Sequence, residues 1–539
     1  MGDVARRLGW GPAGVIVAAV LLALISVVPV VELVATAVGQ GSSALRATFA
    51  RPGSGRAAFN TVWTAVAVTP LAVAGGMAAA LVTERTAAPG RRALRVGVLL
   101  TFLVPPFVSA ESWARAYGPS GLIDDLLGVA LPGLIGPVGV VAVIAVHALP
   151  LAYLVVAGAL TSRAEPDLER AARVAGASRL VTFRTVTLPL LRPALVAAAA
   201  LVFVTAVNAF GIPAVLGLPA GFVTLTTRIY RDLAFAADPA AFTRVVVLST
   251  TLAVLALATV GTADAATGVR GPVTRTGAPA GGAGPTTRRP RGAAVALGAF
   301  LAVTAVVPLG ALVLTAVTRG AGLAPVPGNW TLANFSQALS VTAVRALRNS
   351  MVLAVATATA AVLLGGLLAS LHRRRAGRAL GTAAILTFAV PGSALAVAVL
   401  LAYGRWLRDT LLLILVAYVA KLWALGHRTI AGAVEGLPPD LPRAARASGA
   451  GPLTSLRTVT APLLRPALAG AWLLVFVTAV HELTMSALLY GPGSETLAVV
   501  VLNTLQLGDV TVTSALAVLL TALVLVGSAP LFVLLRPRT

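Results

Sequence analysis

The sequence predicts an all-α polytopic membrane protein with about twelve transmembrane helices in two homologous six-helix halves. Of its 539 residues, 58% are hydrophobic and 11% are charged, and the mean hydropathy is +0.93. This composition leaves too little polar surface for a soluble globular protein. Apolar runs of roughly 20 residues, the length that crosses a bilayer as a helix, recur along the whole chain. A polar, arginine-rich segment also occurs twice, which indicates a tandem duplication.

Each half contains six apolar runs that are long enough to span a membrane. We expect the spans of the first half at residues 13–38, 58–82, 96–114, 136–160, 193–213 and 242–262. We expect the spans of the second half at residues 293–317, 348–371, 380–402, 410–430, 467–489 and 512–535. The halves match outside the polar segment too, since the sequence VFVTAV occurs at both 202–207 and 475–480. Two units with the same orientation should be related by an axis along the membrane normal.

The distribution of arginine predicts the orientation of the chain. The formal net charge of +23 would suggest nucleic acid as the partner of a soluble protein, but short cytoplasmic loops of membrane proteins are enriched in basic residues. If both termini are cytoplasmic, 28 of the 41 basic residues lie inside, 12 lie outside or at outer helix ends, and Lys421 lies within a span. We therefore expect a multi-pass protein of the cell membrane with cytoplasmic N and C termini and no nucleic-acid partner.

Residues 263–292 are rich in Gly, Pro, Thr and Arg and show no apolar periodicity. This composition is typical of a flexible linker. The predicted domains are a first half at 1–262, a cytoplasmic linker at 263–292 and a second half at 293–539.

The duplicated segment begins at Pro166 in the first half and 273 residues later at Pro439 in the second, and 21 of its 30 positions are identical. Proline in the first turn followed by acidic residues predicts the start of a short helix. Gly176 and Gly449 have the spacing of a left-handed cap that ends such a helix. A second short helix should then stop at Pro189 and at Pro462, with the next spans starting at Pro193 and Pro466.

The helix of each copy has a nearly bare surface. The pairs Ala171-Ala172 and Ala444-Ala445 would let the groove of a partner approach the backbone closely, while Arg173 and Arg446 would offer charge to its rim. This pattern favours a docking element over an arbitrary loop.

These two segments resemble the cytoplasmic coupling loop of ATP-binding-cassette (ABC) importer permeases, whose pattern is EAA, three residues, G, nine residues, I, one residue, LP. The predicted coupling loops are residues 163–192 and 435–466. Arg170 and Arg443 replace the acidic residue of the pattern, and Ala461 replaces the leucine in the second copy. The matching residues are Ala171, Ala172, Gly176, Val186, Leu188 and Pro189 in the first loop and Ala444, Ala445, Gly449, Val459 and Pro462 in the second.

The resemblance implies the type I importer permease fold, and a complex of this chain with two ATPase subunits and an extracytoplasmic binding protein or lipoprotein. The only lysine, Lys421, is followed by Leu422, so the chain has no GxxxxGK[ST] phosphate loop. We therefore expect a transport subunit that is not an enzyme and holds no cofactor, with ATP bound and hydrolysed by a partner subunit.

Fused double permeases of this kind resemble the ferric-iron importers and their relatives for thiamine, phosphonates and polyamines. The stretch Asn208–Tyr230 and the sequence His481-Glu482-Leu483 are most similar to the ferric-iron branch. Ferric iron is therefore the expected solute, and thiamine, phosphonate and polyamine stay as alternatives.

Polar residues at membrane depth are costly, and they usually face an aqueous path or a partner group. The candidates are Asn208, Lys421, His481, Glu482 and His147; they line the solute path or pair with one another to hold helices together. Glu32 and Glu111 lie near outer helix ends, where solvation is favoured. Arg228 and Arg231 lie on the outer side, where solvated loop charge is favoured over contact with a binding protein.

The main rival from another class is an ion-coupled secondary transporter of the major-facilitator type, which also has two six-helix halves. Its signature lies between the second and third spans, and residues 371–378 resemble it but lack the aspartate. That class leaves the paired coupling loops unexplained. A membrane enzyme would need clustered carboxylates or histidines near one face, and neither half has such a cluster.

Overall fold

The computed structural model describes residues 12–162, 166–267, 290–323, 326–371, 389–438 and 440–534. These residues form helices and the loops that join them, and an isolated β-bridge pairs Thr318 with Trp330. The first half contains α1 (Pro12–Leu22), η1 (Ala23–Val27), α2 (Val28–Gly39), α3 (Gly41–Ala50), α4 (Ser54–Arg85), α5 (Arg91–Leu103), α6 (Pro106–Tyr117), α7 (Leu122–Leu127), η2 (Pro132–Leu134), α8 (Pro137–Ser162), α9 (Pro166–Val174), α10 (Arg179–Thr182), η3 (Phe183–Thr187), α11 (Leu188–Val207), η4 (Pro213–Gly217), η5 (Leu218–Ala220), α12 (Leu225–Ala234) and α13 (Ala241–Thr267).

The second half repeats this order of helices. It contains α14 (Arg291–Leu301), η6 (Ala302–Val306), α15 (Val307–Ala316), η7 (Pro327–Asn329), α16 (Ala333–Ala338), α17 (Val341–Leu371), α19 (Gly392–Leu407), α20 (Leu411–Glu435), α21 (Asp440–Ala447), α22 (Pro452–Ser455), η8 (Leu456–Thr460), α23 (Ala461–Val480), α24 (Ser486–Leu489), α25 (Leu497–Gln506) and α26 (Val510–Leu534). Helix α13 extends five residues into the predicted linker, whose residues 268–289 lie outside the described residues.

The predicted fold class is confirmed. Ten helices of the described residues are long and apolar enough to cross a membrane, and one further pair of helices passes the same criteria together. This pair is α5 and α6, which meet at an angle of 105°. The third span, which was predicted as one helix at 96–114, is therefore broken. Pro105 and Pro106 lack the amide hydrogens that a continuous helix would need at this point. Part of the predicted ninth span, residues 380–388, lies outside the described residues.

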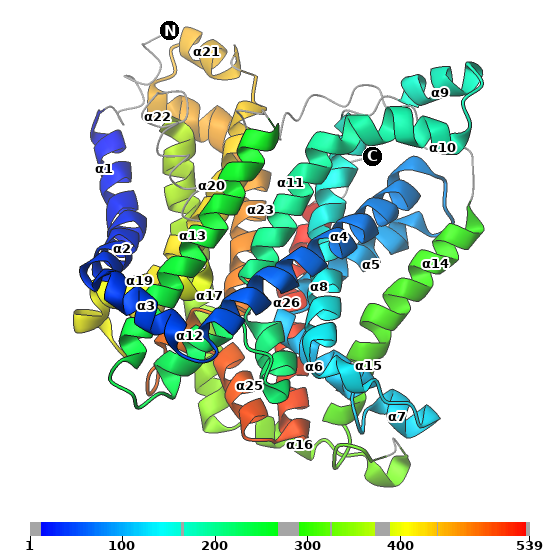
Figure 1. The fold of residues 1–539 in the computed structure, drawn as a ribbon. Helices are drawn as coiled ribbons and strands as arrows, with labels where there is room; N and C mark the ends of the chain where they lie inside the picture. Colours follow the sequence, from blue (N-terminus) through cyan, green and yellow to red (C-terminus); the bar gives the residue numbers. More distant parts are fainter. Residues whose placement is uncertain are drawn as a thin grey trace.

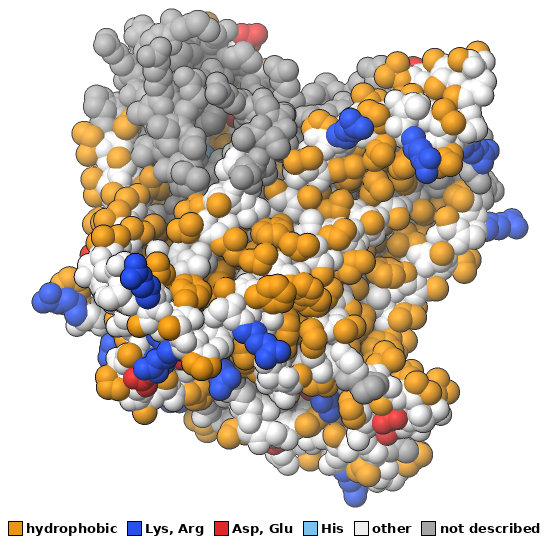
Figure 2. Space-filling view, in the orientation of Figure 1, with side chains coloured by type: hydrophobic (Ala, Val, Ile, Leu, Met, Phe, Trp, Pro, Cys, Tyr) orange, Lys and Arg blue, Asp and Glu red, His pale blue; other side chains and the backbone are white. Residues whose placement is uncertain are grey.

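Figure 2 shows a broad band of hydrophobic side chains between basic residues toward the end that carries α9 and basic residues toward the end that carries α12 and α25. On α4, Phe59, Val66 and Leu71 are each more than half exposed. An apolar surface of this extent is unusual for a soluble monomer and is what a bilayer covers.

Wide π-helical turns let four helices continue past a proline. Each of these turns ends two residues before a proline. The turns are η1 before Pro29, η3 before Pro189, η6 before Pro308 and η8 before Pro462. Proline lacks an amide hydrogen, and its ring collides with the carbonyl four residues earlier in a regular α-helix. In a π-helical turn each backbone amide donates to the carbonyl five residues earlier instead of four. This wider turn moves the carbonyl away from the proline ring, so the two no longer clash.

The expectation that a short helix stops at Pro189 and at Pro462 is therefore wrong. The helix runs without a break from Arg179 to Val207 in the first half, with Pro193 inside it. In the second half it runs from Arg457 to Val480, with Pro466 inside it. Each coupling loop thus passes directly into the fifth span of its half.

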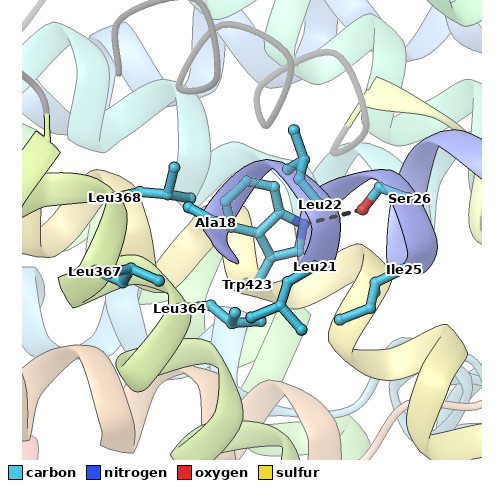
Figure 3. Close-up of a pocket in the computed structure, with 9 residues that line it drawn as sticks. All are labelled: Ala18, Leu21, Leu22, Ile25, Ser26, Leu364, Leu367, Leu368 and Trp423. Carbon is cyan, nitrogen blue, oxygen red and sulfur yellow. Dashed lines mark hydrogen bonds between the residues drawn. The ribbon is translucent and has the colours of Figure 1, made fainter. Parts of the chain in front are cut away.

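The first span of each half makes extensive contacts with the opposite half. Helix α2 packs against α19 and η1 against α20, while α15 packs against α6 and α14 against α5. Figure 3 shows the first of these junctions, where Trp423 of α20 lies between leucines of α1 and leucines of α17. Its indole nitrogen donates a hydrogen bond of 3.3 Å to the hydroxyl of Ser26. The two homologous units are therefore interlocked through their first spans.

Two tyrosines at equivalent positions in the two halves each form a hydrogen bond to the first span of the opposite half. The hydroxyl of Tyr403 donates to the carbonyl of Leu24, and the hydroxyl of Tyr117 donates to the carbonyl of Val303. Each carbonyl lies five residues before a proline, Pro29 or Pro308, which has no amide hydrogen to complete the π-helical pattern. The hydroxyl of the tyrosine from the opposite half donates the hydrogen bond that the proline cannot donate.

We expect Tyr117→Phe and Tyr403→Phe each to lower the free energy of unfolding by about 1–3 kcal/mol, because the carbonyl would lose a hydrogen-bond donor within a membrane span, where the proline five residues later cannot replace it. Chemical unfolding of the purified chain in detergent measures the change. Tyr490→Phe is the matched control, since the hydroxyl of Tyr490 only accepts a long bond of 3.4 Å from Asn503. Equal stability of all three variants would refute the role of these hydrogen bonds.

Candidate functional site: coupling loops and the path between the halves

The two coupling loops lie at the same end of the molecule. Figure 1 shows α9 with α10 at one corner of this end and α21 with α22 at the other. Helix α9 begins at Pro166, as predicted, with Asp167 and Glu169 in its first turn. Helix α21 begins at Asp440, and the predicted start at Pro439 lies outside the described residues. The pair forms two separate projections.

The predicted left-handed turn is present in both loops. Gly176 has φ +89° and Gly449 has φ +84°. In the first loop the amide of Ala177 donates to the carbonyl of Ala172 and the amide of Gly176 donates to that of Arg173, both at 3.0 Å. This is the Schellman pattern that ends a helix and redirects the chain.

Helix α9 and the turn after it expose both apolar and charged side chains. Val174 is 89% exposed, Leu168 and Leu180 are about half exposed, and Ala171 and Gly176 are exposed while Ala172 is half-buried. Arg170 pairs at 3.0 Å with Asp167, and both side chains face solvent. In the second loop Ala444 and Gly449 are exposed and Ala445 is half-buried. Apolar residues with close access to the backbone suit a partner that covers them.

Glu169 anchors the first coupling loop to the helices beneath it. Its carboxylate accepts a hydrogen bond of 2.9 Å from Thr187 of η3 and lies 3.5 Å from the guanidinium of Arg85 at the end of α4. Pro442 stands at the equivalent position of the second loop. The sequence interpretation assigned Glu169 only to the helix dipole, and missed this anchor. A carboxylate directly before Arg170, the position where the family pattern has its acid, was the available signal.

Between the halves, Glu482 organises the turn that follows α23. Its two carboxylate oxygens accept hydrogen bonds from the amide of Met485 at 3.0 and 3.1 Å, and one also accepts from the amide of Ser486 at 3.3 Å. Its backbone carbonyl accepts hydrogen bonds from the hydroxyls of Tyr418 and Ser486, at 3.0 and 2.6 Å. One residue therefore fixes both the turn and the start of α24.

Lys421 lies on α20, near Glu482. Its amine donates to the carbonyl of Val390, which directly precedes α19, and its charge interacts with that of Glu482. Of the predicted path residues, the structure thus brings Lys421 and Glu482 together. Their contacts fit the interpretation in which such groups hold helices together.

Asn208, His481 and His147 have unused hydrogen-bonding atoms. Within the described part of the chain, Asn208 Oδ1, His481 Nδ1 and His147 Nδ1 are buried without a hydrogen-bond partner. Asn208 and His481 occupy equivalent positions, since each follows the repeated VFVTAV sequence. His147 of the first half lies near His481 of the second half. These three are the groups that fit the path interpretation.

His147 borders a small cavity of about 10 Å³ whose walls are partly polar. Its ring stacks on Phe102 with centroids 5.9 Å apart. The lining includes the hydroxyl-bearing residues Thr101, Ser109, Ser112 and Thr304. A space of this size and polarity suits a single water molecule.

At the opposite end from the coupling loops, the short helices α12 and α25 are held in the same way in both halves. Asn60 donates to the carbonyl of Val223 at 2.8 Å, and Asn349 donates to the carbonyls of Gly493 and Glu495 at 3.0 Å. The neighbouring hydroxyls of Thr61 and Ser350 accept the first amides of α12 and α25, at 2.8 and 2.9 Å. The recurrence of these asparagines was visible in the sequence, but gave no indication of this role.

Glu111 corrects an expectation about solvation. We expected Glu32 and Glu111 to be solvated, and Glu32 is exposed. Glu111 is 2% exposed and pairs at 3.0 Å with Arg115 one turn later. The break between α5 and α6 turns α6 into the protein, which hydropathy alone does not indicate.

Comparisons with known proteins detect the same family twice, once in each half of the chain. The sequence profile of the family "Binding-protein-dependent transport system inner membrane component" matches residues 72–263 and again 361–538. A probable ABC transporter permease protein of Sinorhizobium fredii is 27% identical over 83% of this chain and 81% of that protein. The ferric transport system permease protein FbpB of Actinobacillus pleuropneumoniae is 26% identical over 80% of this chain and 64% of that protein. A putative 2-aminoethylphosphonate transport system permease protein of Salmonella paratyphi A is 28% identical over 37% of this chain and 77% of that protein.

Proposed function

Because the chain belongs to the family of binding-protein-dependent transport system inner membrane components and is an ABC importer permease of the cell membrane, we propose that it carries ferric iron and works with two ATPase subunits and an extracytoplasmic binding protein. In this proposal the end that carries α9 and α21 faces the cytoplasm, and the end that carries α12 and α25 faces the binding protein.

The paired glycine turns carry the proposal of two ATPase subunits. Each turn presents an exposed helix with alanines that give close access to the backbone, and the two helices lie at separate corners of one face (Figure 1). Two equivalent projections suit two copies of one partner related by the same pseudo-twofold axis. Arg170, Ala171, Ala172, Gly176 and Pro189 in the first loop, and Arg443, Ala444, Ala445, Gly449 and Pro462 in the second, are the proposed coupling residues.

Ferric iron is supported by the long match to a permease that is named for ferric transport, which covers 80% of this chain. The shorter match to a phosphonate permease keeps phosphonate as the second candidate. Uptake of radioactive iron by cells that express the complete system, compared with cells that lack this chain, tests the first candidate. Loss of phosphonate uptake with unchanged iron uptake would replace it by the second.

We propose that transport proceeds by alternating access. ATP binding would close the pair of ATPase subunits and carry α9 and α21 toward each other. Because each fifth span is continuous with its coupling loop through a π-helical turn, this displacement would reach α11 and α23 directly. The halves would then open toward the binding protein, and hydrolysis would restore the inward-facing arrangement. The proposed residues of the path are Asn208 and His481, which have unused hydrogen-bonding atoms, together with Lys421 and Glu482, whose contacts would also hold the helices beside it.

Native mass spectrometry of the tagged chain, extracted from its own membrane in a mild detergent, tests the assembly. We expect two copies of one nucleotide-binding subunit per chain. If the chain repeatedly migrates alone in several detergents while remaining folded, the proposed assembly is wrong.

A further inference from the structure

A cavity of about 410 Å³ opens between the two halves at the end opposite the coupling loops. It is lined by Leu218, Tyr230, Arg231, Phe235 and Gln506. Tyr230 and Arg231 belong to α12 of the first half, whereas Gln506 ends α25 of the second. The side-chain amide of Gln506 donates to the hydroxyl of Tyr230 at 3.3 Å. A ligand in this cavity would touch both halves at once.

Tyr230 is held rigidly at this cavity. Its side chain is 1% exposed, and its ring makes edge-to-face contacts with Phe210 and Phe235 at centroid distances of 5.2 and 5.5 Å. Such pairs favour one orientation of the ring. The hydroxyl is therefore presented at a fixed point beside Arg231.

Arg231 is exposed, and its side chain forms no hydrogen bond or ion pair with any described residue. The nearby carboxylates are already occupied by other arginines. Asp232 pairs with Arg228 at 3.1 Å and with Arg244 at 3.3 Å. Asp238 pairs with Arg244 at 2.6 Å and with Arg51 at 2.5 Å.

The arginines of this network are paired, and Arg231 is the charged residue that lines the cavity. Arg244, the amide of Ala240 and Arg51 hold the pKa of Asp238 at about 2, so this aspartate stays ionised and paired at neutral pH. Three arginines, Arg51, Arg228 and Arg244, share the two aspartates, and Arg231 takes no part in these pairs. Of these four arginines, Arg231 is the one without a counter-ion among the described residues, and its side chain lines the cavity.

We propose that this cavity binds an oxyanion group, of the carboxylate or phosphate type, on the solute that enters the path. A guanidinium offers parallel donors that match two oxygens of such a group. The side-chain amide of Gln506 has a second hydrogen and supplies a further donor, and the hydroxyl of Tyr230 holds this amide in place through hydrogen bonds of 3.3 and 3.4 Å. The inference rests on the proposed function only in taking this end as the side of entry.

The positive charge of Arg231 in the cavity wall limits the class of solute that can bind there. Thiamine and polyamines are cations and would be repelled there, as would a metal ion without anionic ligands. A phosphonate carries the oxyanion group itself, whereas iron would bring it on an accompanying anion. The shared chemistry is the oxyanion, and the source is decided by experiment.

Isothermal titration calorimetry of the purified chain in nanodiscs tests the site directly. Inorganic phosphate, citrate and spermidine serve as probes at about 0.15 M ionic strength, where charges further apart than about 8 Å are screened. We expect phosphate or citrate to bind, and Arg231→Gln to weaken that binding at least tenfold. Arg319→Gln is the matched control, because Arg319 is an exposed arginine at the same end that does not line the cavity. Tyr230→Phe should weaken binding less than Arg231→Gln.

Several results would overturn the proposal. Equal anion binding by the wild-type chain, Arg231→Gln and Arg319→Gln would mean an adventitious ion only. Absence of anion binding, or binding of spermidine instead, would also overturn it. So would a weaker response to the binding protein in Arg231→Gln with unchanged anion binding, which would assign Arg231 to a protein contact.

Further measurements distinguish the two possible sources of the oxyanion, and they also test the anion site separately from the proposed assembly with ATPase subunits. Uptake of iron supplied with citrate, impaired by Arg231→Gln, would place the oxyanion on an anion that accompanies the metal. Uptake of 2-aminoethylphosphonate, impaired by the same substitution, would place it on the solute, and either result supports the site. If the chain is isolated with two ATPase subunits but binds no anion, the inference of an anion site is wrong, while the proposed assembly is supported.

Discussion

Replacing Gly176 and Gly449 together by valine is expected to lower solute uptake at least tenfold while the membrane helices stay folded. Both glycines have a left-handed backbone, which costs about 1–2 kcal/mol for a residue with a side chain. An added Cβ would meet no atom within 4 Å at either glycine, so the effect comes from the backbone and not from a clash. The turn should unwind, and the coupling helix should lose its direction.

Uptake and ATP hydrolysis are measured together in proteoliposomes that contain the complete importer. We expect hydrolysis to persist, because the nucleotide site belongs to another subunit, and to become independent of the binding protein. Helix content by circular dichroism reports on the spans. Asparagine at both positions should preserve most uptake, since it tolerates the left-handed conformation.

Gly90→Val provides the matched strain control. Gly90 also has a positive φ, of +68°, and an added Cβ there would meet no atom within 4 Å. It directly precedes α5 and lies outside both coupling loops. If Gly90→Val impairs uptake as much as the double substitution, or if the double substitution leaves uptake normal, the docking role of the glycine turns is wrong.

The features that sequence predicted well are those set by local chemistry. Gly176 and Gly449 end their helices as expected, because few residues other than glycine adopt that backbone conformation. The spans were predictable because their length and apolarity follow from the thickness of the bilayer. Both kinds of feature depend on residues that are close together in the chain.

Proline was misinterpreted for a physical reason. Pro189 and Pro462 were expected to stop a helix, and instead a π-helical turn takes up the missing hydrogen bond. Pro105 and Pro106 do break the third span, although the same rule was not applied to them. Whether a helix bends, widens or ends at proline depends on which neighbours can satisfy the freed carbonyl, as Tyr403 does for Leu24.

The arrangement of the spans was not available from hydropathy. A helix that faces lipid and a helix that faces another helix carry similar apolar residues, because lipid is as apolar as leucine. The exchange of first spans between the halves therefore left no trace in the pattern. Glu111 was misplaced for the same reason, since its burial depends on the direction that α6 takes after the break.

Replacing Glu482 by leucine is expected to cost about 3 kcal/mol or more in the free energy of unfolding and to abolish uptake. The carboxylate accepts hydrogen bonds from the amides of Met485 and Ser486, and hydrogen bonds to a charged group are worth about 1.5–3 kcal/mol each. The substitution would also leave Lys421 without the negative charge it interacts with. Chemical unfolding in detergent and uptake in proteoliposomes measure the two effects.

Glu482→Gln separates the hydrogen bonds from the charge. Its amide oxygen can still accept from Met485, so we expect it to retain more than half of the lost stability. Asp125→Leu is the surface control, because Asp125 is exposed and its side chain makes no hydrogen bond or ion pair with a described residue, so its replacement should change stability by no more than about 0.5 kcal/mol. If Glu482→Gln is stable but still fails to transport, the charge of Glu482 acts in the path; if stability and uptake fall in parallel in every variant, Glu482 acts by holding the turn before α24, and the path must be assigned to Asn208, His147 and His481.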